Sequence, residues 1–314
     1  MNKNFVFALG STIILLFATL ATPAAAQRHD DGVLRILAIG NSFSDDGMEH
    51  LPALLENMGI KNVELARLYV GGCTLQQHIN FHDTKQAAYM FYHSKAGENR
   101  WHKSPHNVTM QHALTMGEWD IITMQQASGV SGIYDSYHPY LDQLIKAVRK
   151  IQPKAELVWH MTWAYSTNSA HGEFPNYDRN QQKMYKAIEE CVRRLRKEYG
   201  IRTIIPSGTA IQSLRGSKIN NAPMDFTRDG YHMDYGSGRY AVACTWYETL
   251  IKPYTQRTMV GNTLRPAVGT PVTDHMAHYI HKAAKQATKK PFKVREVKVK
   301  HDKEPKGKEH KAHK

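Results

Sequence analysis

Cysteine is scarce in this chain of 314 residues. The three that occur, Cys73, Cys191 and Cys244, form an odd and sparse set. This excludes a disulfide framework, because at most one pair could form. Cys191 and Cys244 lie in apolar stripes with helical spacing, which predicts buried free thiols.

Motifs that bind metals, cofactors or nucleotides are missing as well. The sequence has no glycine-rich phosphate loop and no dinucleotide fingerprint. The histidines between residues 78 and 113 do not follow a zinc-binding spacing such as His-Glu-x-x-His. The sequence therefore predicts no cofactor, no metal site and no nucleic-acid partner.

Long hydrophobic runs are absent except at residues 5–21. This run is short for a membrane span, follows Lys3 and precedes a cleavage site of small residues that ends at Ala26. Such a pattern is typical of a secretory signal peptide. We expect residues 1–26 to be removed, with no membrane span afterwards and a secreted or periplasmic location.

The net charge of +13 is concentrated at one end of the chain. Residues 281–314 contain 13 lysines and arginines and four acidic residues, so the rest is nearly balanced. The sequence predicts a folded domain over residues 27–290 and a basic, disordered tail over 291–314. The tail is either simply solvated or adheres to polyanions such as acidic glycans.

Apolar runs with strand character alternate with segments of helical periodicity. The predicted strands are Val33–Ile39, Val63–Val70, Asp120–Met124, Leu157–Ala164 and Arg202–Ile205. The predicted helices are 50–59, a stretch from Thr74, 141–151, 184–195, 236–251 and 272–289, and residues 84–118 form an irregular insertion. This alternation predicts an α/β fold in three layers around a parallel five-stranded sheet.

Ligands of such sheets bind beyond the carboxyl ends of the strands. The first strand ends there in "GNSFS", residues 40–44, where a serine on a strand-to-helix turn exposes its hydroxyl. Ser42 is the candidate nucleophile, although a plain turn explains the same residues. Gly72, in the loop after the second strand, could direct an N–H group to the same point.

A serine nucleophile needs a histidine base and an orienting carboxylate. Asp-x-x-His occurs twice, at Asp135…His138 and at Asp229…His232. The second pair is favoured because it lies in a glycine-rich loop that follows all five predicted strands. Asp234 is a second choice for the carboxylate that orients His232.

These residues resemble the sequence blocks of the SGNH (GDSL-type) hydrolases over about residues 34–250. Gly40–Ser44 resembles the first block, Gly72 the second and Asp229–His232 the last, closest to a poorly characterised branch of secreted bacterial proteins. The resemblance implies a flavodoxin-like sheet and ester hydrolysis through an acyl-enzyme, without metal or cofactor. It assigns Ser42 as nucleophile, His232 as base, Asp229 as its partner, and the N–H groups of Ser42 and Gly72 as oxyanion donors.

The third block departs from the family pattern, which has an asparagine that donates to the oxyanion. Here the strand runs "DIITMQQASG". We hypothesise that Gln125 or Gln126 supplies the missing donor. If so, replacing both by alanine lowers turnover on the order of 10²-fold, and unchanged turnover in this double variant would remove them from the mechanism.

Other residues have a functional and a structural interpretation. Trp163 and Trp101 could stack on a sugar ring or belong to the core. His78 faces the site or the surface. Asp45 and Asp46 are interpreted as residues at the start of a helix, favoured by its dipole.

The sequence thus predicts a secreted serine esterase that removes an O-acyl group, with acetyl as the first choice, from a carbohydrate. The expected partner is a small-molecule or glycan ester substrate. A lipid or thioester hydrolase is the alternative within the same class. A carbohydrate-binding protein on an esterase scaffold without catalysis is the alternative from another class. The missing asparagine keeps this alternative open, whereas the presence of Ser42, Asp229 and His232 argues against it.

Overall fold

A seven-stranded sheet forms the centre of the computed structural model, which describes residues 31–299, with strand order β4-β3-β2-β1-β5-β6-β7. Five of the strands are parallel neighbours in the order β2-β1-β5-β6-β7. They are β1 (Leu34–Gly40), β2 (Val63–Tyr69), β5 (Ile121–Met124), β6 (Glu156–His160) and β7 (Ile204–Ile205). The predicted α/β fold and its flavodoxin-like parallel strands are confirmed.

The predicted strand number of five is wrong, because the insertion at 84–118 adds two more. β3 (Met90–Ser94) pairs antiparallel with β2, and β4 (His102–Lys103) pairs antiparallel with β3. Among the five parallel strands, β2 lies at an edge, and its outer backbone N–H and C=O groups have no partner there. Strand β3 pairs with this edge and satisfies these groups. The same segment also contains α4 (Met110–Thr115).

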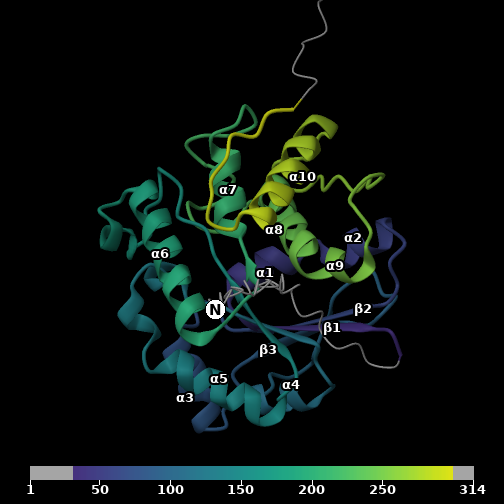
Figure 1. The fold of residues 1–314 in the computed structure, drawn as a ribbon, viewed down its shortest axis with the longest axis vertical. Coiled ribbons are helices and arrows are strands. Elements are labelled where there is room, and N and C mark those ends of the chain that lie inside the picture. The colour runs from purple at the N-terminus through teal and green to yellow at the C-terminus, as the bar shows by residue number, and fades with distance from the viewer. Residues whose placement is uncertain (1–30, 300–314) are drawn as a thin grey trace, which may run out of the picture.

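Helices cover both faces of the sheet, as the three-layer prediction requires. One layer contains α3 (Leu75–Asp83), α4 and α5 (Tyr140–Ile151) in mutual contact. The other contains α1 (Ser42–Met48), α7 (Ser207–Arg215), α8 (Ser237–Trp246) and α10 (Asp274–Lys289), and Figure 1 shows the two layers on opposite sides of the strands. The remaining elements are α2 (Leu51–Asn57), α6 (Gln181–Tyr199), a π-helical turn (Tyr247–Ile251), α9 (Lys252–Thr255) and 3₁₀ turns at Ser128–Val130, Tyr134–Tyr137 and Phe174–Tyr177.

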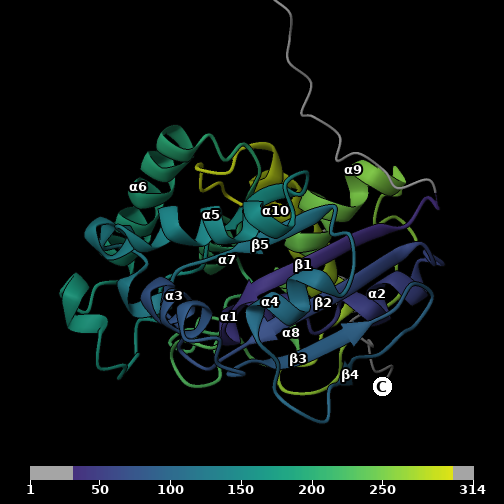
Figure 2. The ribbon, with the colours of Figure 1, turned by 90° about the horizontal axis from the view of Figure 1, so that it is seen from below.

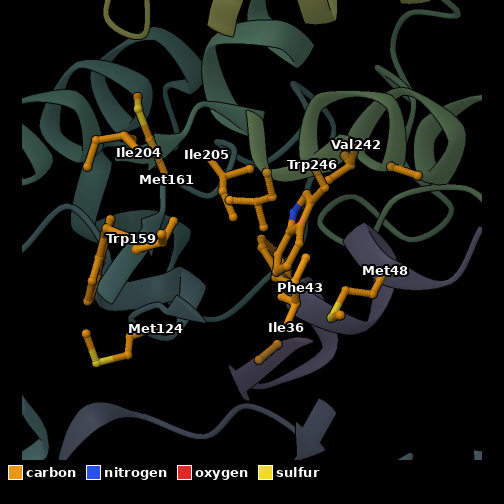
Figure 3. Close-up of a cluster of buried hydrophobic side chains, with 14 of the residues drawn as sticks. Ile36, Phe43, Met48, Met124, Trp159, Met161, Ile204, Ile205, Val242 and Trp246 are labelled. Atoms are coloured by element: carbon orange, nitrogen blue, oxygen red, sulfur yellow. The ribbon is translucent and has the colours of Figure 1, made fainter. Parts of the chain in front are cut away.

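The core extends beneath the first turn of α1. Figure 3 shows Phe43 of α1 close to Ile36 of β1 and Trp246 of α8, all of them buried. The helices α1 and α8 approach closely because Gly47 has no side chain: a Cβ there would lie 2.6 Å from Nε1 of Trp246. This contact fixes the helix that begins at Ser42.

The predicted boundary between the domain and the basic tail, at residue 290, needs a correction. Val297 is buried in the core, and the guanidinium of Arg193 lies 4.2 Å above the ring of Phe292, so part of the segment 291–299 packs against the domain. The predicted signal peptide and residues 300–314 lie outside the described residues. Within 31–299 no helix is long and apolar enough to cross a membrane, and all three cysteines are buried and free.

Replacing Gly47 by alanine should destabilise the fold. The added methyl group meets the buried indole of Trp246, and such overpacking costs about 1–3 kcal/mol, more than alanine gains in helix propensity. Urea unfolding should show a lower free energy of unfolding for Gly47→Ala. Gly117→Ala is the matched control, because its Cβ meets no atom within 4 Å. Equal stability of Gly47→Ala and wild type would contradict the close contact.

Candidate active site

The turn that presents Ser42 is shaped by its neighbours. Strand β1 ends at Gly40, and Asn41 caps α1 by accepting a hydrogen bond from the N–H of Phe43 at 3.0 Å. A Cβ at residue 40 would lie 2.2 Å from Oγ of Ser44, so only glycine allows this approach. The segment predicted as a turn is thus the first turn of a short helix, with Ser42 partly exposed at its start.

Ser42, His232 and Asp229 form one hydrogen-bonded chain. Nε2 of His232 lies 2.8 Å from Oγ of Ser42, although the two residues are 190 positions apart in the sequence. On the other side of the ring, Nδ1 lies 2.7 Å from Oδ2 of Asp229. This arrangement fits a ring that carries its proton on Nδ1 and leaves Nε2 free to accept the serine proton.

The carboxylate of Asp229 is held in its ionised form. Burial acts to raise its pKa, but hydrogen bonds from the side chain and N–H of His232 and from the N–H of Tyr231 outweigh burial, and the pKa lies below its ordinary value. The negative charge therefore persists at neutral pH and favours a proton on Nδ1 of His232.

Asp46 connects the serine helix to the histidine loop. Its side chain is fully buried, and Oδ1 accepts from Arg228 at 3.1 Å and from Arg239 at 2.8 Å. Oδ2 accepts from the N–H of Met233 at 2.8 Å. Since Met233 directly follows His232, Asp46 places His232 relative to Ser42. Our interpretation of Asp46 as a helix-start residue was wrong, because its charge is used in tertiary contacts.

The neighbouring Asp45 does lie in the first turn of α1, as predicted. It also forms an ion pair with Arg67, whose Nε is 3.2 Å from Oδ1. Burial raises the pKa of Asp45, and Arg67 and Arg239 oppose this effect. Arg228 and Arg239, on either side of Asp229-x-x-His232, are the sequence signal that could have predicted partners for the acidic pair at 45 and 46.

The loop of Gly72 lies against the serine turn. Nδ2 of Asn41 donates to the carbonyl of Cys73 at 3.1 Å, which ties the end of β1 to the end of β2. Gly72 has a φ of +62°, a left-handed conformation that glycine adopts without strain. It is exposed, so its N–H remains our proposed oxyanion donor together with that of Ser42.

The two glutamines form hydrogen bonds within the protein. Nε2 of Gln125 donates to Oδ1 of Asn41 at 2.6 Å, and Nε2 of Gln126 donates to the carbonyl of Ser136 at 2.9 Å. Both side chains are buried. Each amide nitrogen thus donates to a protein partner, and we propose that the two glutamines position the turn instead of binding the oxyanion.

Trp163 was predicted as a sugar-stacking residue, and this is wrong because its side chain is fully buried. Its ring stacks on Phe43 with centroids 4.2 Å apart, and Nε1 donates to the carbonyl of Tyr231 at 2.7 Å. The indole therefore supports the backbone just before His232. Trp101 is half-buried under the guanidinium of Arg67, at 4.3 Å.

The remaining alternatives lie away from the triad. Asp234 accepts hydrogen bonds from Gly236, Ser237, Gly238 and Thr270, and so caps α8 instead of orienting His232. His138 contacts Tyr199. His78 is neither at the site nor at the surface: it is buried against Tyr89, and burial lowers its pKa to about 4. Among residues 31–299 no cluster of three metal-ligating side chains occurs.

Asp46→Asn should lower activity more than Asp45→Asn. The amide keeps the shape of the side chain but removes the charge that holds two arginines, and a small displacement of His232 costs about 10²-fold in rate. We expect a loss of that order in kcat for a small ester, with KM nearly unchanged. Equal kcat values for the Asp46 and Asp45 variants would show that Asp46 does not position the base.

A family model described as a domain of unknown function, DUF4886, matches residues 35–287. A DUF4886 family protein from Bacteroides uniformis is 38% identical, with a TM-score of 0.77 over 84% of this chain and 98% of that one. A protein named as a candidate GDSL-like lipase from Parabacteroides merdae is 16% identical, with a TM-score of 0.46 over 69% of this chain and 95% of that one.

An acetylxylan esterase variant from Geobacillus stearothermophilus is 10% identical, with a TM-score of 0.44 over 69% of this chain and 94% of that one. Among curated proteins nothing matches. The family model covers almost all of the described domain, and the chain belongs to the DUF4886 family.

Proposed function

We propose that this protein is a serine ester hydrolase that works through an acyl-enzyme. The observation that supports it is the chain from Ser42 through His232 to Asp229, with distances of 2.8 Å and 2.7 Å. A serine hydroxyl is a weak nucleophile unless a base removes its proton as it attacks, and this geometry supplies that base.

The reaction would proceed in two steps. Oγ of Ser42 attacks the ester carbonyl while its proton moves to Nε2 of His232, and the N–H groups of Ser42 and Gly72 stabilise the oxyanion. The alcohol then leaves with the proton from His232, and the acyl group stays on the serine. A water molecule, activated by His232, hydrolyses this ester and releases the acid and free Ser42.

The substrate that we propose is an O-acyl group, acetyl in the first instance, on a carbohydrate. A long acyl chain would need an extended apolar surface beside the serine. Across residues 31–299 the exposed large hydrophobic side chains are Met116, Tyr235, Val260, Val268 and Val294, and these do not form such a surface. Export through the predicted signal peptide would bring the enzyme to glycans outside the cytoplasm.

Ser42→Ala should abolish hydrolysis of 4-nitrophenyl acetate. Without the hydroxyl no acyl-enzyme forms, and kcat/KM should fall by at least about 10³-fold. Ser104→Ala is a matched control, since residue 104 is partly exposed in the segment after β4. Equal rates for wild type and Ser42→Ala would favour the alternative of a carbohydrate-binding protein without catalysis.

Activity should fall as the pH becomes acidic. His232 must be neutral to accept a proton, whereas the lowered pKa of Asp229 keeps that carboxylate charged through the same range. Asp229→Asn removes the charge and should reduce kcat on the order of 10²–10⁴-fold. A rate that stays constant from pH 5 to 9, with chemistry limiting, would contradict the assignment of His232.

A further inference from the structure

A cavity of about 800 Å³ lies apart from the triad, between α10, the segment from the π-helical turn to α9, and residues 258–265. Arg295, from the segment that was predicted to be a disordered tail, contributes to its wall. The volume is within the range of cavities that hold small organic ligands. Ser42, His232 and Asp229 are not among the lining residues.

The cavity lies at the end of the sheet opposite to Ser42. Nη1 of Arg257 donates to the carbonyl of Met58 at 2.8 Å, and the N–H of Thr263 donates to Asn57 at 2.9 Å. These partners end α2, just before β2 begins, whereas Ser42 follows the carboxyl end of β1. Figure 2 shows α2 and α9 on one side and α1 toward the other end of β1. A ligand can therefore bind here without touching the reacting ester.

Positive charge dominates the wall. The lining cations are Lys252, Arg265, Lys282, Lys285, Lys289 and Arg295. Glu248 is the acidic residue among the lining side chains, and it is paired with Lys252. Arg265 is paired with Asp274 at 2.9 Å.

The charges of Lys285 and Lys289 have no such partner. Within residues 31–299 neither forms an ion pair, and Nε of Arg295 is buried without a hydrogen-bond partner. Lys282, Lys285 and Lys289 share one face of α10, where like charges repel and weaken the helix. An anionic ligand would compensate this cluster.

A neutral histidine adds polar contacts to the same wall. His281 lies 2.8 Å from the hydroxyl of Tyr240, which also accepts from Nδ2 of Asn262 at 2.8 Å. Burial, Arg265 and His278 lower the pKa of His281 to about 4. The ring is therefore uncharged at neutral pH, and the cations around it make protonation unfavourable.

We propose that this cavity binds an acidic oligosaccharide, a glycan with carboxylate or sulfate groups. The three lysines of α10 span about 10 Å along the helix axis, which suits several anionic groups better than a single ion. The lining contains no phenylalanine, tyrosine or tryptophan ring on which a nucleic-acid base could stack. The choice of a glycan rests on the proposed function, in which the cavity anchors a polymer whose ester reaches Ser42.

The test measures binding of tetragalacturonate to the full chain by titration calorimetry. Lys285→Gln/Lys289→Gln removes two charges from the cavity, and Lys154→Gln/Lys186→Gln removes two from exposed lysines outside it. Both variants have the same net charge, so general attraction to the basic chain cancels. We expect Kd to rise by about tenfold in the first variant and to stay unchanged in the second.

Neutral cellotetraose should bind more weakly than tetragalacturonate to the wild type. An equal loss in both double variants, or equal affinity for the two sugars, would overturn the proposal. So would tighter binding of an oligothymidylate of the same charge, which would make the site one for nucleic acid. The rate of 4-nitrophenyl acetate hydrolysis should be the same in Lys285→Gln/Lys289→Gln as in the wild type. If the wild type does not hydrolyse this ester at all, the proposed esterase function is refuted, but the result on glycan binding still stands.

Discussion

The buried carboxylate of Asp46 is the contact on which the arrangement of the site depends. It brings together two segments that are 187 positions apart, the helix that begins at Ser42 and the backbone just after His232. A fully buried carboxylate is costly unless it is paired and hydrogen-bonded. Here two arginines and one N–H group satisfy it, so the folded state is favoured only when the serine helix and the histidine loop are in contact.

A second buried network supports the serine turn through Gln125. Gln125 donates to Asn41 and accepts from Ser44, and its Oε1 lies 2.9 Å from Nδ1 of His160. Burial lowers the pKa of His160 to about 3, so the ring is neutral and takes part as a fixed donor and acceptor. The amide of Gln125 is thus held by three protein partners next to the serine turn. The oxyanion would then depend on backbone N–H groups.

Sequence patterns predicted the fold well where the chain repeats a simple rule. Continuous apolar runs such as Val33–Ile39 identify buried parallel strands, and their order follows from right-handed crossovers. The edge strands at Met90–Ser94 and His102–Lys103 were missed because they are short and mix polar with aromatic residues. The contact between Asp229 and His232 was predictable because the two residues lie on one turn and need no long-range information to be paired.

The residues that were misjudged are those whose role depends on distant partners. Asp46 resembles any acidic residue in the first turns of a helix until Arg228 and Arg239 are placed beside it. Trp163 lies just after a strand, where exposure and burial are equally compatible with the sequence, and stacking on Phe43 decides for burial. Arg295 was assigned to a disordered tail because net charge along the chain does not reveal which side chains face a cavity.

The central claim is that Ser42 is a nucleophile activated by His232, and covalent labelling tests it most directly. A fluorophosphonate probe reacts with an activated serine hydroxyl, and mass spectrometry of the digested protein locates the adduct. The account predicts one adduct on the peptide that contains Ser42, and none in His232→Ala. Labelling of a different serine, or undiminished labelling of Ser42 without His232, would contradict it.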